Sequence, residues 1–182
     1  DSKYIGIGCN DGQALVLGID GNVVTELKGH KKLVSYIEFS SDNKTIVTSS
    51  DDQTAKLWDV STSLNTGFNG NCLHTFKNFT QMVNRIYFSK NNKYLLTSSD
   101  DGSSIIWDTK GNIITYYKAL VSIQDAVFSP DETKIFAIGD NGYIRILPAF
   151  VSDNYIRKIE KERGVFRQLT EQDKINYGII EK

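Results

Sequence analysis

An imidazole, a hydroxyl and a carboxylate occur within one short stretch of this sequence, at His30, Thr48 and Asp52. These are the groups that a hydrolase triad combines: the carboxylate orients the imidazole, which activates the hydroxyl. The alternative is structural, because a fold tolerates buried polar side chains when each finds a hydrogen-bond partner. Trp58 follows closely and would block access to such a triad. The other histidine, His74, has no serine or cysteine motif nearby, so we expect no catalytic residues.

Acidic residues recur at three expected turns and raise the question of a calcium site. The turns are Asp51-Asp52, Asp100-Asp101 and Asp140-Asn141-Gly142. Calcium takes about six to eight oxygen ligands, which an EF-hand supplies from one twelve-residue loop. The residues after each turn do not continue in that way, and hairpin geometry explains the turns. We predict no metal and no cofactor, and no nucleotide-binding signature occurs.

Charge and hydropathy exclude further classes. A net charge of −1 provides no long-range attraction to nucleic acid or to an anionic membrane. Lys28, Lys31 and Lys32 lack an accompanying arginine or glycine-rich cradle, so they indicate a solvated loop rather than a phosphate site. No apolar run approaches the roughly 20 residues that a membrane span needs. The two cysteines, Cys9 and Cys72, form no disulfide framework and suit reduced thiols inside a cell.

Two stretches of the chain repeat one pattern of residues. The first opens with Gly29-His30 and closes with Trp58-Asp59. A shift of 49 positions places Val83, Ile86, Phe88, Thr97, Asp101, Trp107 and Asp108 on Val34, Ile37, Phe39, Thr48, Asp52, Trp58 and Asp59. Recurrence at this period is typical of repeat architectures in which each repeat is one small sheet.

Short apolar runs separated by turn residues predict four groups of strands. Asp-Gly and Asn-Asp-Gly supply the positive φ that tight hairpins require. The expected strands lie at 3–8, 13–19 and 22–28; at 34–40, 45–50, 54–59 and 72–77; at 83–89, 94–99, 103–108 and 112–118; and at 123–128, 135–139 and 143–147. Residues 60–71, rich in Ser, Thr, Asn and Gly, are expected to be a surface loop.

With its Gly-His start, Trp-Asp end and repetition, the chain resembles the WD40 repeat family. The resemblance implies an all-β propeller segment of about four four-stranded sheets, and a tetrad of hydrogen-bonded side chains within a sheet. In the second repeat the tetrad is His30, Thr48, Asp52 and Trp58; in the third it keeps Thr97, Asp101 and Trp107, but Phe79 stands where the histidine should be. In the fourth repeat the four positions hold Ala119, Ala137, Asn141 and Leu147. This structural role replaces the triad interpretation.

The family also implies where partners bind. Three positions in each repeat face the upper surface of a propeller: those three and five residues after the histidine, and the one before the tetrad aspartate. Here they are Leu33, Ser35, Asp51, Met82, Asn84, Asp100, Ser122, Gln124 and Asp140. The set combines an acidic rim with two apolar candidates, Leu33 and Met82, so we expect a basic or mixed basic–apolar protein segment as partner.

The repeats are expected at 1–28, 29–77, 78–118 and 119–150, followed by a partly helical C-terminal tail at 151–182. The first repeat lacks an inner strand, and Pro148 interrupts the path to an outer strand in the last. Because propellers close with roughly four to eight sheets, we expect missing blades from a longer parent chain or self-association of two copies. The first alternative makes this the C-terminal part of a larger propeller.

The expected function is a non-catalytic protein–protein interaction scaffold or sensor in the cytoplasm. The alternative is the regulatory region of a larger signalling enzyme, such as a caspase-like protease, an NTPase or a kinase. The ending Leu169-Thr170-Glu171, with Tyr177-Gly178 after it, resembles bacterial WD40 proteins in which such repeats form the sensor half of a signalling protein.

Overall fold

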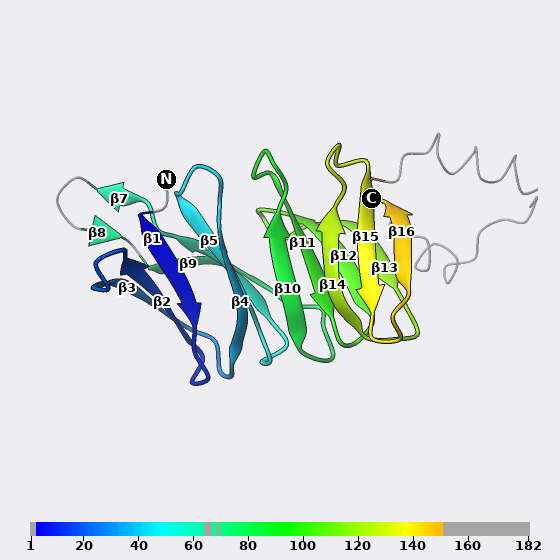
Figure 1. Cartoon of the computed structure of the whole chain (residues 1–182), viewed down its shortest axis with the longest axis horizontal. Helices are drawn as coiled ribbons and strands as arrows, with labels where there is room; N and C mark the ends of the chain where they lie inside the picture. Colours follow the sequence, from blue (N-terminus) through cyan, green and yellow to red (C-terminus); the bar gives the residue numbers. More distant parts are fainter. Residues whose placement is uncertain (1–2, 64–66, 69, 151–182) are drawn as a thin grey trace, which may run out of the picture.

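A computed structural model describes residues 3–63, 67–68 and 70–150 of the chain. Within these ranges the chain is all strand, turn and loop, and it contains no helix. Sixteen strands form four antiparallel sheets and one two-stranded hairpin (Figure 1). The sheets follow one another along the chain, and neighbouring strands of a sheet are consecutive except where the two-stranded hairpin is inserted, so every sheet is a local unit.

The first two sheets differ by one strand. Sheet 1 has the order β1 (Tyr4–Gly8), β2 (Gln13–Gly18), β3 (Val23–Lys28). Sheet 2 has the order β4 (Val34–Phe39), β5 (Thr45–Ser50), β6 (Ala55–Asp59), β9 (Asn71–Phe76). Between β6 and β9 the chain forms the hairpin of β7 (Thr62–Ser63) and β8 (Gly67–Phe68). The expected loop at 60–71 therefore contains two short strands that its polar composition did not indicate.

The last two sheets repeat this arrangement. Sheet 3 has the order β10 (Val83–Phe88), β11 (Tyr94–Ser99), β12 (Ser103–Asp108), β13 (Ile113–Lys118). Sheet 4 has the order β14 (Ile123–Phe128), β15 (Lys134–Gly139), β16 (Ile144–Pro148). Sheets 2 and 3 have four strands each. By strand register, the three strands of sheet 1 correspond to the second, third and fourth of these, and the three strands of sheet 4 correspond to the first, second and third.

Glycine fixes the turn between β11 and β12. Gly102 has a φ of +88°, and a Cβ placed there would lie 2.4 Å from the carbonyl oxygen of Ala119. Only glycine combines this backbone conformation with so close an approach of a neighbouring strand end. The Asp-Gly dipeptide thus determines both the hairpin and the position of the loop that leads into the next sheet.

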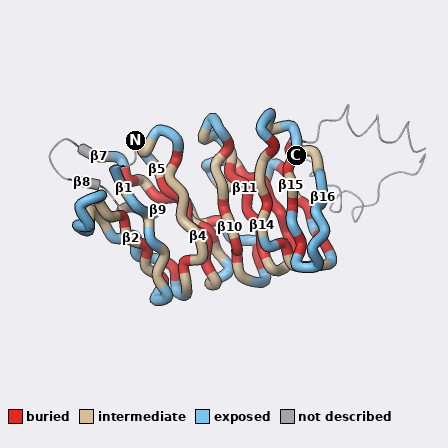
Figure 2. The backbone as a smooth tube through the Cα atoms, in the orientation of Figure 1, coloured by how far each residue is buried: buried red, intermediate tan, exposed pale blue. Residues whose placement is uncertain are grey.

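Neighbouring sheets pack face to face, and their facing side chains form three apolar cores. Figure 2 shows buried residues concentrated where one sheet meets the next. Trp58 and Ile46 belong to the core between sheets 1 and 2, and Trp107 and Phe76 to the core between sheets 2 and 3. A third core, which includes Ile135, joins sheets 3 and 4. The strands β4, β10 and β14 lie side by side as the inner strands of this stack (Figure 1).

The all-β class and the stacked four-strand sheets, with the first and last incomplete, are confirmed. Most observed strand bounds lie within a residue of the expected ones, because alternation and turn residues are both strong local signals. The expected helical tail at 151–182 lies outside the described residues.

Candidate functional site

Sheet 2 contains a continuous chain of hydrogen bonds between side chains. Asp52 Oδ2 lies 3.0 Å from His30 Nδ1, and His30 Nε2 lies 2.7 Å from Thr48 Oγ1. The indole N–H of Trp58 donates to Thr48 Oγ1 at 2.9 Å. The four residues come from the loop before β4, from β5, from the β5–β6 turn and from β6. Their hydrogen bonds therefore connect these four segments of sheet 2.

Burial determines the charge of the imidazole. It lowers the pKa of His30 below its ordinary value, and the nearby charge and hydrogen bond of Asp52 do not reverse this shift. His30 is therefore neutral near pH 7, and its contact with Asp52 is a hydrogen bond rather than an ion pair. A neutral ring donates from one nitrogen and accepts at the other, so Nδ1–H donates to Asp52 and Nε2 accepts from the Thr48 hydroxyl.

Asp52 is held by more than the histidine. Burial alone would raise the pKa of its carboxyl, but hydrogen bonds from the Thr54 hydroxyl and from the Lys31 N–H lower it below its usual range. The two contacts are 2.6 Å and 2.9 Å long. Asp52 thus remains ionised and anchors both the loop before β4 and the turn after β5.

Sheet 3 keeps only half of this chain. The Trp107 indole N–H donates to Thr97 Oγ1 at 3.0 Å, matching the pair in sheet 2. Phe79, where the histidine would be, is buried and lies 5.9 Å from the Trp107 ring, measured between ring centroids. Asp101 accepts from the Thr80 N–H at 2.9 Å and pairs with Lys118 at 3.2 Å. Its partner is therefore a cation from the outer strand.

Sheet 4 has lost the chain of bonds. Ala119 and Ala137 are buried in the apolar core and offer no polar side-chain atom. Asn141 accepts a hydrogen bond from the backbone of Tyr143 at 3.2 Å, and Leu147 is partly buried against the core. The hydrophobic contact with sheet 3 replaces the polar contacts.

The buried position of the sheet 2 chain excludes the triad chemistry that its residue types allow. The exposed fractions of Thr48, His30 and Trp58 are 0%, 7% and 1%. A substrate carbonyl has no path to the Thr48 hydroxyl, which is already shared between the imidazole and the indole. In the described parts of the chain, no cluster of three or more His, Cys, Asp or Glu side chains could hold a metal ion. Nor does that part contain a helix long and apolar enough to cross a membrane.

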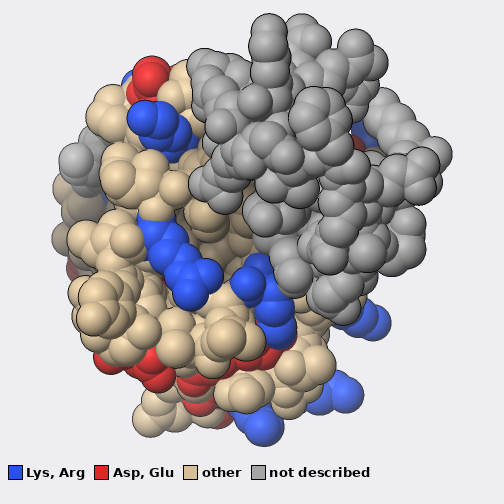
Figure 3. All heavy atoms as spheres, turned by 90° about the vertical axis from the view of Figure 1, so that its right-hand side faces the viewer, with Lys and Arg blue, Asp and Glu red and all other residues tan. Residues whose placement is uncertain are grey.

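The turns between β5 and β6, β11 and β12, and β15 and β16 lie at one end of the sheets, along the lower edge of Figure 1. This end is called the Asp face below, after Asp51, Asp100 and Asp140. In Figure 3 a band of Asp and Glu side chains runs along the lower part of the molecule. Asp140 and Gln124 are exposed there, whereas Leu33 and Met82 are half-buried.

Two of the expected contact residues join neighbouring sheets instead of facing outward. Ser35 Oγ donates to the Val83 carbonyl at 2.8 Å, and so bridges sheet 2 to sheet 3. Asn84 is buried, and its Nδ2 donates to the Ile123 carbonyl at 2.9 Å, which bridges sheet 3 to sheet 4. Equivalent positions in successive repeats therefore perform the same connecting task.

Asp51 and Asp100 occupy equivalent turn positions but have different surroundings. Asp100 Oδ1 accepts hydrogen bonds from Asn84 at 2.7 Å, Ser122 at 2.6 Å and Gln124 at 3.3 Å. Asp51 Oδ1 is buried, and no residue in the described part of the chain donates to it. At the next repeat Met82 stands where Ser122 supplies a hydroxyl to Asp100, and Ser35, the counterpart of Asn84, donates to Val83 instead.

The comparisons with known proteins agree with this geometry. The family model "WD domain, G-beta repeat" matches residues 21–59 and 70–108, the segments that contain both tryptophan–threonine pairs. Residues 21–59 and 70–108 are WD40 repeats. WD40 domains as a class are generally not catalytic and bind protein partners.

Curated WD40 relatives each match about a third of the chain. The U3 small nucleolar RNA-associated protein 15 homolog of Xenopus laevis is 37% identical over 65 residues, which is 35% of this chain and 13% of that protein. The Xenopus tropicalis homolog is 36% identical over 61 residues, 33% of this chain and 12% of that protein. Apoptotic protease-activating factor 1 of Mus musculus is 34% identical over 61 residues, 33% of this chain and 5% of that protein. Each match spans a small share of its relative's length.

The expected cytoplasmic location is contradicted by these relatives. The two Xenopus proteins carry the name of a small nucleolar RNA-associated protein, which indicates the nucleolus rather than the cytoplasm. Net charge and two reduced cysteines cannot distinguish one compartment within a cell from another.

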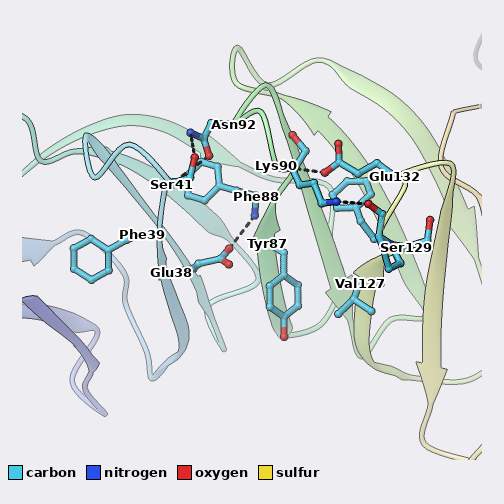
Figure 4. A pocket seen from close by; sticks show the side chains of 13 residues that line it. Glu38, Phe39, Ser41, Tyr87, Phe88, Lys90, Asn92, Val127, Ser129 and Glu132 are labelled. Carbon is cyan, nitrogen blue, oxygen red and sulfur yellow. Dashed lines mark hydrogen bonds between the residues drawn. The ribbon is translucent and has the colours of Figure 1, made fainter. Parts of the chain in front are cut away.

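A pocket of about 380 Å³ lies at the end opposite the Asp face, and the repeat pattern did not indicate it. It is lined by the ends of β4, β10 and β14 and by the turns that follow them; Figure 4 shows these side chains. Glu38, Tyr87 and Val127 occupy equivalent positions on the three inner strands. An alignment of the sequences of the three inner strands places a carboxylate, an aromatic ring and an aliphatic side chain at the same position.

Proposed function

We propose that this chain is a protein-interaction module that binds a basic or mixed basic–apolar protein segment on its Asp face. The observation that supports it is the buried Oδ1 of Asp51, which receives no hydrogen bond from the described residues. A buried acceptor without a donor costs about 1–3 kcal/mol, and more for a charged group. Asp51 as a whole is only half-buried, so a lysine or arginine from a partner that contacts its carboxylate would offset this cost, because charge-assisted hydrogen bonds are the strong ones.

Apolar contacts on the Asp face fit the same partner. Leu33 and Met82 flank the Asp51 turn at equivalent positions, and each is half-buried. Their carbonyl groups accept from the N–H groups of Asp51 and Asp100, at 3.0 Å in both cases, so the backbone beneath them is fixed. Fixed, partly exposed apolar side chains are suitable anchors for binding.

The proposed surface is smaller than the family positions alone suggest. Ser35 and Asn84 are committed to contacts between sheets, and Ser122 donates to Asp100. Gln124 also donates to Asp100, so the surface that is left consists of Leu33, Asp51, Met82 and Asp140. We propose no catalytic role for it, because the candidate triad of His30, Thr48 and Asp52 is buried behind Trp58.

The relatives suggest two settings for such a module. The name of the Xenopus proteins favours a scaffold within a ribonucleoprotein assembly, where this chain would contact a protein subunit. The similarity to apoptotic protease-activating factor 1 favours the second candidate, a regulatory region of a larger signalling protein. Imaging of the tagged full-length protein separates them: nucleolar signal supports the first, and a diffuse or membrane-associated signal supports the second.

A peptide selection tests the binding surface. Random peptides displayed on phage are selected on the wild-type chain, and the affinities of the selected peptides are measured by fluorescence anisotropy. We expect lysine- or arginine-containing peptides whose binding weakens about ten-fold or more in the Asp51→Asn variant, the loss of one charge-assisted contact. Glu26→Gln, an equal change of charge on β3, is the matched control. Selected peptides without basic residues, or equal binding to Asp51→Asn, would contradict the proposal.

A further inference from the structure

The pocket opposite the Asp face is lined by residues at equivalent positions on the three inner strands. Glu38 comes from β4, Tyr87 from β10 and Val127 from β14, and all three line the pocket (Figure 4). Its volume of about 380 Å³ lies within the usual range for a site that takes a small group. This site is separate from the surface of the proposed function, since the turns that border it lie at the other end of the strands.

Glu38 gives the pocket a carboxylate with one protein partner. Its Oε2 accepts from the Phe88 N–H at 2.9 Å, a backbone group on the free inner edge of β10. No other described residue donates to this carboxyl group. Burial raises the pKa of Glu38, and the Phe88 hydrogen bond opposes this only in part. A cation that enters the pocket would therefore meet an anion that is poorly compensated.

The aromatic side of the pocket is suited to a flat cation. One level away on the same strands, the Arg85 guanidinium lies over the Tyr36 ring, 5.2 Å from its centroid. The chain therefore already places a guanidinium from one inner strand on a tyrosine of the neighbouring strand. At the pocket level Tyr87 provides the ring and Glu38 the counter-charge, but the third position is Val127 and supplies no cation. Guanidinium groups both stack on rings and pair with carboxylates.

Lys90, the one lysine among the described residues that line the pocket, is already engaged. The Lys90 ammonium donates to the Pro130 carbonyl, and the Lys90 backbone N–H donates to Glu132 Oε1 at 2.5 Å. Both contacts lie at the rim, between the turns after β10 and β14, as Figure 4 shows. The described residues that line the pocket carry two carboxylates, Glu38 and Glu132, and one lysine, so their net charge is negative.

We propose that this pocket binds an arginine side chain of a protein partner. Glu38 accepts hydrogen bonds from the guanidinium, Tyr87 contacts its flat face, and Val127 packs against the methylene groups. Charge complementarity favours a cation, and the combination of an acid, a ring and an aliphatic wall favours arginine over lysine.

Blocked single amino acids test the proposal directly. N-acetyl-arginine-N-methylamide is titrated into the ¹⁵N-labelled chain, and the amide shift of Phe88 is followed because its N–H contacts Glu38. Blocked citrulline, which has the same shape without the charge, is the matched neutral probe, and blocked lysine tests the geometry. We expect arginine to move the Phe88 signal, citrulline to bind at least about ten-fold more weakly, and lysine to bind more weakly than arginine.

Variants locate the site. Glu38→Gln keeps an acceptor for the Phe88 N–H and removes the charge, so arginine binding should fall about ten-fold or more. Glu26→Gln and Asp51→Asn should leave it unchanged, and the second also separates this site from the Asp face. Citrulline or lysine binding as tightly as arginine, or a Glu38→Gln variant that binds like the wild type, would overturn the proposal. Loss of binding in Asp51→Asn would do so as well.

Discussion

Sheets 2 and 3 share one scaffold and differ at one decisive position, His30 in the first and Phe79 in the second. The tryptophan–threonine hydrogen bond is nearly identical in both, 2.9 Å in sheet 2 and 3.0 Å in sheet 3. In sheet 2 the histidine extends this bond to Asp52. In sheet 3 the phenylalanine ends it and fills the same space with an aromatic ring.

The difference shows that the repeat does not depend on a complete polar chain. In sheet 3 the Trp107 ring lies 5.4 Å from Phe76 and 5.9 Å from Phe79 between ring centroids, so aromatic packing supplies the contact that the imidazole would make. Asp101 is satisfied by backbone N–H groups and by Lys118. One architecture thus accepts either hydrogen bonding or apolar packing, provided that each buried polar group finds a partner.

The largest effect is expected from Phe79→Ala. The substitution removes a buried ring from the core between sheets 2 and 3, and such changes cost about 3–5 kcal/mol. Denaturant unfolding measures the loss of unfolding free energy, and Phe150→Ala, at an exposed phenylalanine, is the control. A loss below about 1 kcal/mol would show that Phe79 contributes little to the packing of Trp107.

A smaller loss is expected from His30→Phe, which copies sheet 3 into sheet 2. The new ring adds apolar contact near Trp58, but Thr48 and Asp52 each lose a hydrogen bond. We expect a net loss of about 1–2 kcal/mol in unfolding free energy. Asp52 keeps its bonds from Thr54 and Lys31, which limits the cost. A variant more stable than the wild type would mean that the hydrogen-bonded side chains of sheet 2 stabilise the fold less than apolar packing at the same place.

A smaller loss of unfolding free energy is expected when the pH is lowered, and it also depends on His30. Because burial lowers the pKa of His30 in the folded chain, the unfolded chain binds the proton first as the pH falls through about 6.5. The contribution of the neutral histidine to stability is therefore present above that pH and lost below it. Unfolding free energy measured between pH 8 and pH 5.5 should decline in the wild type and decline less in His30→Phe. Parallel curves would rule out this role for His30.

The smallest effect is expected from Lys118→Met, which removes the cation that sheet 3 uses in place of the imidazole. The side chain of Lys118 is 37% exposed, so its pair with Asp101 contributes about 0.2–1 kcal/mol, and less in high salt. Lys77→Met, at the equivalent exposed position of sheet 2, is the matched control. A large loss that persists in about 1 M salt would show that the role of Lys118 is packing rather than charge.

Local sequence signals were sufficient for most of the fold. Alternating apolar residues and Asp-Gly turns placed the strands, and the recurrence of Trp58 as Trp107 defined equivalent positions. The same signals did not indicate the β7–β8 hairpin, because residues 60–71 carry neither an apolar alternation nor a second copy elsewhere in the chain. Periodicity identifies what repeats, and features that occur once escape it.

The candidate site was predictable only in part. Repeat position alone suggested that Ser35 and Asn84 face a partner, whereas they connect adjacent sheets. The two aspartates of the Asp face look equivalent in the sequence, yet Asp100 has three donors and the Oδ1 of Asp51 has none among the described residues. Part of the difference arises from Met82 and Ser122, which belong to the following repeat in each case, and part from Asn84, whose counterpart Ser35 donates to Val83 instead.

The sequence by itself determined the four sheets, their order and the residue types available for the polar chain, because hairpin pairing is a short-range property of alternation and turns. Only the tertiary structure decided how neighbouring sheets use those residues: which carboxylate lacks a donor, which lysine replaces a histidine, and which three inner-strand side chains share a pocket. Contacts between sheets depend on how two surfaces are placed against each other, and a one-dimensional period carries no information about that placement.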